Sequence, residues 1–140
     1  MPRRRTVAVF DMRIHNPQSY EEIQNLDITR LYNDLVEEFT YIRNPNPGSR
    51  GHPHVHFGHL LSGYDAGYYA YIWALVFGAD VFETKFAQDP RNRNVWERYR
   101  RTILEPGGSR DEMNLVEEFL GRSLSPEPLL RRLGLNKKRV

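Results

Sequence analysis

The feature that most constrains the fold is an apolar and aromatic run, YYAYIWALVF, at residues 68–77. Its ten residues fall well short of the roughly 20 apolar residues that a membrane-spanning helix needs. We expect a helix that begins near Asp65 or Ala66 and ends near Ala87. Because such a helix is apolar on nearly all faces, it should be buried on every side. The rest of the chain would then have to pack around it.

The segments on either side of this run also predict helices. Asp27 stands at an N-cap position, and the apolar residues after it follow at helical spacing: Ile28, Leu31, Tyr32, Leu35, Val36 and Phe39. Further helices are expected from about Asn94, after a capping box formed by Ser109 and Glu112, and after Ser125. Residues 7–15 are ambiguous between strand and helix. The sequence therefore predicts an all-α fold in a single helical domain, residues 1–140.

Composition limits the classes of protein that the chain can belong to. Six of the 20 basic residues lie in the end segments 1–6 and 136–140, which leaves 14 basic against 18 acidic residues between them. We therefore expect two solvated basic tails rather than a nucleic-acid interface, because no recognition motif accompanies them. The chain has no cysteine, which fits a reducing compartment. The expected location is the cytoplasm, with no signal peptide and no membrane partner.

Four of the five histidines lie within residues 52–59, in a segment rich in glycine and proline. If the backbone there is extended, His52, His54 and His56 point to one side and could chelate a divalent ion, with His59 or Asp65 as a further ligand. The alternative is a polar loop whose histidines face solvent or bond to the backbone. The spacing matches no standard metal motif, so both interpretations stay open.

Tyrosines form a second candidate site. If the helix begins near Asp65, Tyr64, Tyr68 and Tyr71 share one of its faces, and their phenol groups could converge on one bound oxygen atom. The alternative is an aromatic core stripe whose hydroxyl groups reach the backbone.

Two segments, FGHLLSGYDAGYYAYIWALVFGADVFETKF and RYRRTILEPGGSRDEMNLVEEFLGR, together with the helix LDITRLYNDL, identify a family. From about Phe10 to Leu135 the chain resembles the C-terminal part of the thimet oligopeptidase family of zinc peptidases. The resemblance implies the C-terminal catalytic helical portion of an all-helical enzyme that hydrolyses short peptides. Maturation of a precursor peptide and general peptide turnover are both compatible with it.

The resemblance also implies roles for particular residues. Tyr64 and Tyr71 match the tyrosines that donate hydrogen bonds to the oxyanion or the substrate, and are the expected catalytic residues. His59 matches a substrate-orienting histidine, and Tyr68 matches a further tyrosine of the cleft. The expected substrate-binding set is thus His59, Tyr64, Tyr68 and Tyr71.

The metal side of the family's site is missing from this sequence. No histidine is followed by glutamate, so the zinc-binding H-E-x-x-H motif is absent and zinc is implied by the family without ligands in this chain. Leu75 also replaces an acidic residue of the family pattern. We expect either the substrate-binding half of an oligopeptidase, inactive alone and partnered by a chain that carries H-E-x-x-H, or an inactive or repurposed module that binds peptides or small molecules.

Overall fold

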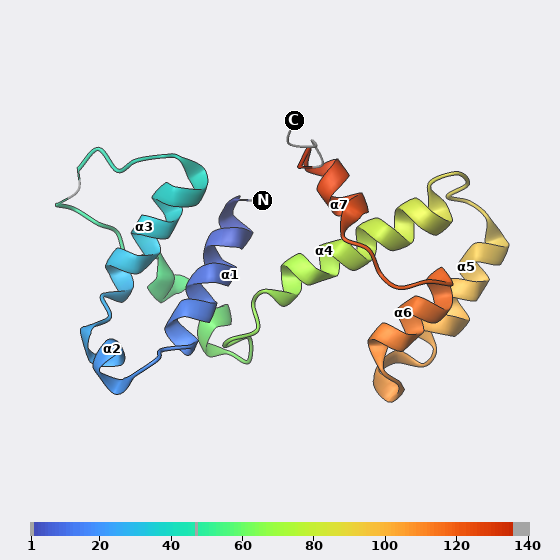
Figure 1. Cartoon of the computed structure of the whole chain (residues 1–140), viewed down its shortest axis with the longest axis horizontal. Coiled ribbons are helices and arrows are strands. Elements are labelled where there is room, and N and C mark those ends of the chain that lie inside the picture. Colours follow the sequence, from blue (N-terminus) through green and yellow to red (C-terminus); the bar gives the residue numbers. More distant parts are fainter. Residues whose placement is uncertain (1, 47, 136–140) are drawn as a thin grey trace. The chain divides into compact units, whose positions relative to one another are not determined.

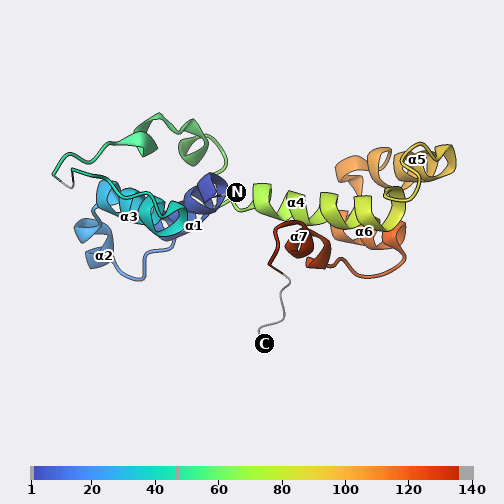
Figure 2. The ribbon, with the colours of Figure 1, turned by 90° about the horizontal axis from the view of Figure 1, so that it is seen from above.

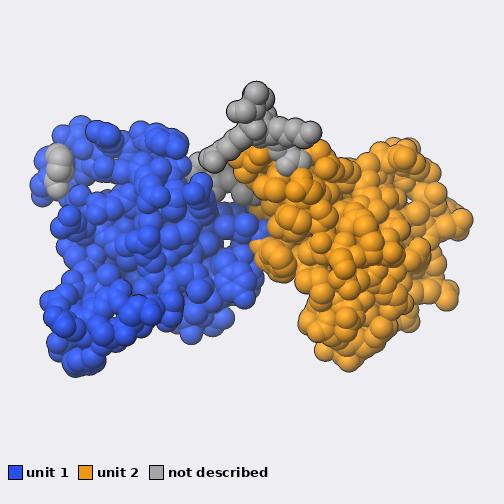
Figure 3. All heavy atoms as spheres, in the orientation of Figure 1, with its two compact units in different colours: residues 1–72 blue, residues 73–140 orange. Residues whose placement is uncertain are grey.

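The computed structural model describes residues 2–46 and 48–135, and all its regular elements in those ranges are helical (Figure 1). The predicted all-α fold is therefore confirmed. The chain divides into two compact units, residues 1–72 and 73–140 (Figure 3). The single domain predicted for residues 1–140 stays a prediction. Among the described residues, no helix has the length and hydropathy required to cross a membrane.

The first unit is built on three helices, α1 (Pro2–His15), α2 (Tyr20–Asn25) and α3 (Ile28–Thr40). Helices α1 and α3 lie side by side, and the segment that follows α3 crosses one face of this pair (Figures 1 and 2). The buried apolar residues between them come from α1, α3 and this segment: Val7, Ala8, Phe10, Tyr32, Leu35, Leu60 and Tyr68. The core therefore fixes the segment after α3 against the two helices.

The N-terminal helices show where local sequence decides structure. Asp27 caps α3, because its Oδ1 accepts a hydrogen bond from the Arg30 N–H at 2.8 Å, as predicted. The ambiguous residues 7–15 are helical. Residues 2–6, expected within a basic tail, instead form the first part of α1, and Thr6 is buried. The other expected tail, 136–140, lies outside the described residues.

The segment between α3 and α4 (Ala70–Val81) contains two 3₁₀ turns, Pro53–His56 and Gly58–Leu61. The prediction that α4 begins near Asp65 is wrong. Residues 64–70 form successive turns instead, with hydrogen bonds from Gly67 N to Tyr64 O and from Ala70 N to Gly67 O. The backbone of Ala66 has a φ of +56°, which ends any right-handed helix at that point.

Helix α4 is not buried on every side, so that prediction is also wrong. Val76 and Ala79 are buried, whereas 48% of the Trp73 surface is exposed. Because apolar residues lie on all sides of the helix, its sequence does not determine which face is buried. Only tertiary contacts decide which residues become buried.

The second unit continues from α4 through a π-helical turn at Phe82–Phe86 to α5 (Arg93–Tyr99), which ends in another π-helical turn at Arg100–Leu104. A 3₁₀ turn at Gly107–Ser109 leads to α6 (Glu112–Leu120) and then to α7 (Glu127–Arg132). Phe119 is fully buried, and its ring lies 5.4 Å from that of Tyr99 and 6.3 Å from that of Phe86. An aromatic core therefore joins the π-helical turn after α4 to α5 and α6.

Caps in this unit differ in part from the predicted ones. Asp111, and not Ser109, caps α6, because its carboxylate accepts from Asn114 N at 2.9 Å. The chain is still in the 3₁₀ turn at Ser109, so the helix starts later than the capping box predicts. Gly121 ends α6 with a φ of +79°, as predicted.

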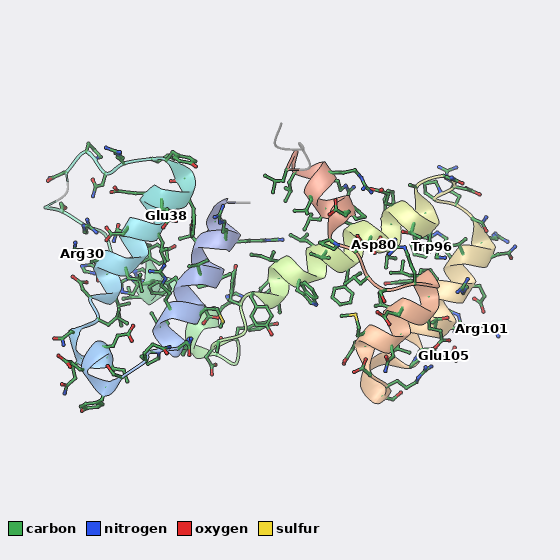
Figure 4. All side chains as sticks on the ribbon, in the orientation of Figure 1. Arg30, Glu38, Asp80, Trp96, Arg101 and Glu105 are labelled. Atoms are coloured by element: carbon green, nitrogen blue, oxygen red, sulfur yellow. The ribbon has the colours of Figure 1, made fainter. Side chains whose placement is uncertain are left out.

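Asp80 of α4, labelled in Figure 4, is the fully buried carboxylate of the second unit. Arg122 donates two hydrogen bonds to it, from Nη2 to Oδ1 at 2.5 Å and from Nη1 to Oδ2 at 2.8 Å. Ser125 N and Thr84 Oγ1 donate to it at 2.8 and 3.1 Å. These bonds, with the Arg122 contact first, lower the pKa of Asp80 and tie the segment after α6 to α4.

Candidate functional site

The four predicted substrate-binding residues gather in the first unit as one ring cluster: His59, Tyr64, Tyr68 and Tyr71. The His59 ring centroid lies 5.5 Å from that of Tyr64, 6.0 Å from that of Tyr68 and 5.9 Å from that of Tyr71. The Tyr64 and Tyr71 rings stack at 5.3 Å with an interplanar angle of 26°, and Tyr68 and Tyr71 are 4.9 Å apart. The structure therefore places the predicted residues together, while their roles stay predictions.

Three different local structures contribute to the ring cluster. His59 lies in the second 3₁₀ turn, Tyr64 and Tyr68 lie in the turns that follow, and Tyr71 lies in the first turn of α4. We predicted that all three tyrosines share one face of a single helix. This prediction is wrong, because α4 starts only at Ala70. Convergence comes from the turns, which fold the tyrosines back onto the start of the helix.

The side chains of the ring cluster differ in solvent exposure, from a buried tyrosine to an exposed histidine. Tyr68 is buried, and Phe57 packs edge-on against its ring at 5.3 Å. Tyr64 is 41% exposed and His59 is exposed. Hydrogen bonding with Tyr64 is the largest cause that raises the pKa of Tyr71, followed by partial burial. Like any tyrosine phenol, that of Tyr71 carries its proton at neutral pH and can donate a hydrogen bond.

Asp11 of α1 fastens these turns, and sequence analysis missed it. Its fully buried carboxylate accepts a hydrogen bond from Ala66 N at Oδ1 and another from Tyr68 N at Oδ2, both at 3.0 Å. The strained φ of Ala66 costs about 1–2 kcal/mol, which these bonds help to offset. The sequence did contain one signal for Asp11, an acidic residue inside the apolar stretch VAVFDMRIH. This signal becomes informative only once that stretch is known to be a buried helix.

The other histidines do not form the hypothesised metal site. Because Pro53–His56 is a 3₁₀ turn rather than an extended strand, His52, His54 and His56 do not share one face. His52 Nδ1 bonds to Thr29 Oγ1 at 2.9 Å. The His54 ring packs 5.9 Å from the rings of Phe10 and Tyr32, and burial lowers its pKa. The polar-loop interpretation holds for the exposed His52 and His56, whereas His54 packs against the core.

Zinc does not fit the residues that the structure describes. Within residues 2–46 and 48–135, no three histidine, aspartate or glutamate side chains are grouped so that they could hold a metal ion. None of the five histidines precedes a glutamate. The structure therefore assigns no metal chemistry to the ring cluster.

Comparison with known proteins agrees with these observations. Residues 1–135 match the model of peptidase family M3. Saccharolysin of Saccharomyces cerevisiae is 40% identical over 129 residues, which are 91% of this chain and 17% of that protein. Thimet-like oligopeptidase of Dictyostelium discoideum is 33% identical over 132 residues, 92% of this chain and 18% of that protein.

A bacterial relative matches the chain with similar identity and coverage. Oligopeptidase A of Escherichia coli is 30% identical over 129 residues, 91% of this chain and 18% of that protein. The chain thus spans less than a fifth of the length of each of these three relatives, although nearly all of its own length is matched. The family predicted from the motifs is confirmed: this chain belongs to peptidase family M3.

Proposed function

We propose that this chain supplies the substrate- and oxyanion-binding residues of an oligopeptidase that hydrolyses short peptides. The observation that carries the proposal is the ring cluster, in which one histidine and three tyrosines meet at centroid distances of 4.9–6.0 Å. Membership of peptidase family M3 supports peptides as the substrate class. The absence of cysteine fits a cytoplasmic setting.

Within this proposal, Tyr64 and Tyr71 are the catalytic donors. Their rings stack at 5.3 Å, and hydrogen bonding between the two phenols raises the pKa of Tyr71, so both side chains are close enough to act on one bound group. A fixed donor aimed at a developing oxyanion stabilises a transition state by about 3 kcal/mol. His59 is exposed beside both tyrosines and orients the substrate backbone, while the buried Tyr68 supports the floor of the cluster.

In this proposal the attacking water is activated elsewhere, because the described residues include no group of three side chains that could hold zinc. The partner in this proposal is therefore a polypeptide that carries the H-E-x-x-H motif. Cleavage belongs to the combined unit, and the chain alone is expected to be inactive.

A chimera tests the proposal without depending on assembly of two chains. The segment of saccharolysin that matches this chain is replaced by residues 1–135, and cleavage of a quenched fluorescent oligoalanine peptide is followed. We expect cleavage that a chelator abolishes, with kcat lowered about 10²-fold by Tyr71→Phe. Tyr20→Phe, at a 73% exposed tyrosine of α2, is the matched control and should change nothing.

Two results would contradict the proposal. Chelator-sensitive cleavage by the chain alone would show that it has its own metal site. An unchanged kcat in Tyr71→Phe, with the chimera active, would remove Tyr71 from the oxyanion site.

A second candidate function is a peptide-binding module without catalysis. It is favoured by one observation: all four rings come from residues 59–71 and lie within the first unit. Fluorescence anisotropy of a labelled oligoalanine peptide with the isolated chain tests it. Binding that Tyr71→Phe abolishes and Tyr20→Phe preserves is expected, and equal binding by both variants would contradict it.

A further inference from the structure

Asp11 is a buried carboxylate that accepts hydrogen bonds from two backbone amides of a distant segment. It has 0% exposed surface and lies in the middle of α1, more than 50 residues before the turns that it contacts. Burying a carboxylate is costly unless hydrogen bonds satisfy its oxygens. We therefore expect this buried aspartate to hold the backbone amides that it contacts in fixed positions.

Both carboxylate oxygens are engaged. Oδ1 accepts from Ala66 N and Oδ2 accepts from Tyr68 N, each at 3.0 Å. His15 Nδ1, one turn later on α1, lies 2.9 Å from Oδ1. The carboxylate thus bridges two amides that stand two residues apart, and this spacing fixes the turn between them.

The bridged turn carries the ring cluster. Tyr64 precedes Ala66 by two residues, Tyr68 is itself bonded to Asp11, and Gly67 N bonds back to Tyr64 O at 2.9 Å. Ala66 adopts a left-handed φ of +56° that an alanine avoids without support. Release of the two amides would let this residue relax and would move Tyr64 away from Tyr71.

We propose that Asp11 is a positioning residue of the ring cluster, which sets the distance between Tyr64 and Tyr71 through the backbone amides of Ala66 and Tyr68. The proposal rests on the proposed function for its consequence in peptide binding. The geometric part concerns this chain alone and is measured without a substrate.

The second unit offers a matched control. Asp80 is also fully buried on a helix and also accepts a hydrogen bond from the backbone N–H of a distant residue, Ser125. Its hydrogen-bond partners Thr84, Arg122 and Ser125 all lie in the second unit, whereas the ring cluster lies in the first. Asp11→Asn and Asp80→Asn therefore remove the same charge from equally buried sites, and only the first should disturb the tyrosines.

The main experiment compares the two variants with the wild-type chain by NMR titration of ring-labelled tyrosines, with Tyr71 assigned by Tyr71→Phe. Hydrogen bonding with Tyr64 raises the pKa of Tyr71 in the wild-type chain. We expect this pKa to fall in Asp11→Asn and to stay unchanged in Asp80→Asn. An unchanged Tyr71 titration in a folded Asp11→Asn chain would overturn the proposal.

Binding of labelled oligoalanine is measured on the same samples. Loss of a hydrogen bond to a charged group should weaken binding about tenfold in Asp11→Asn and leave it unchanged in Asp80→Asn. If the Tyr71 titration shifts in Asp11→Asn while the wild-type chain binds no peptide, the positioning role is supported and peptide binding by the chain alone is contradicted; the proposed function itself is tested separately by the chimera. The two failures are thus distinguishable.

Hydrogen exchange of the wild-type chain covers the case in which Asp11→Asn does not fold. The amides of Ala66 and Tyr68 should exchange at least about tenfold more slowly than in an unstructured peptide, because both are bonded to a buried acceptor. Exchange of both at the unstructured rate would overturn the proposal.

Discussion

Replacement of Arg122 by methionine should destabilise the second unit, because it leaves the Asp80 carboxylate buried without its cation. Methionine keeps much of the length of the arginine side chain but donates no hydrogen bond. The variant loses the two Arg122 bonds at 2.5 and 2.8 Å, while Ser125 N and Thr84 Oγ1 remain. The experiment therefore measures the effect of one missing partner on a fully buried charge.

The magnitude follows from the environment of each partner. Breaking a fully buried ion pair by removal of one side costs about 3–5 kcal/mol. Arg122 is 43% exposed, so water can reach part of the vacated space and the cost should lie near 2–3 kcal/mol. With an m-value of about 1–3 kcal/mol/M, the urea midpoint should fall by roughly 0.7–3 M.

Tryptophan fluorescence is the assay, since both tryptophans of the chain, Trp73 and Trp96, lie in the second unit. The double variant Asp80→Asn with Arg122→Met removes the charge together with its partner and should recover about 1–2 kcal/mol. If the double variant is no more stable than Arg122→Met, the cost does not come from an uncompensated charge.

The same pair predicts a pH dependence with a definite sign. Arg122 lowers the pKa of Asp80 below its unfolded value near 3.9. The stabilisation is therefore complete above the unfolded pKa and is lost as pH falls through the folded pKa. The gap in stability between wild type and Arg122→Met should narrow as the pH is lowered from 7 through this window. A gap of constant size would refute the electrostatic explanation.

Three further predictions concern the second unit. Phe119→Ala should cost about 3–5 kcal/mol in urea unfolding, because the ring is fully buried among aromatic neighbours; a loss below about 1 kcal/mol would contradict this. Gly121→Ala should cost about 1 kcal/mol in the same assay, since alanine must adopt a φ of +79° to end α6. NMR titration of Glu97 should give a pKa of about 2, because hydrogen bonds from Arg100 and then Arg101 lower the pKa of this carboxyl group. Arg100→Gln should raise the pKa of Glu97. An ordinary glutamate pKa in the wild-type chain would show that these contacts do not persist in solution.

Local sequence was sufficient to predict a helix where the helix has its own N-cap residue and one continuous apolar face. Helix α3 follows this rule, because Asp27 supplies the cap and the apolar face repeats at helical spacing. Helix α4 does not, since its apolar residues occur on all faces and its first turn depends on what precedes it. Asp65 and Ala66 look like a helix start, yet the left-handed φ of Ala66 is held by Asp11, which lies 55 residues away.

The candidate site shows the same division. Family motifs identified His59, Tyr64, Tyr68 and Tyr71, and the structure brings their rings together. The spacing argument predicted the right neighbours by the wrong geometry, because it assumed one continuous helix. Asp11 could not be found by periodicity, since its importance lies in contacts with backbone amides that carry no residue-specific signature.

Anchoring through amides has a consequence for how this site can change over evolution. Asp11 holds N–H groups that every residue type except proline possesses. At position 68 the hydrogen bond that fixes the turn therefore does not depend on the side chain, although the tyrosine ring there also packs in the buried core. Turn geometry is thus encoded by backbone atoms, so selection can alter the exposed side chains of His59 and Tyr64 while the turn is inherited unchanged.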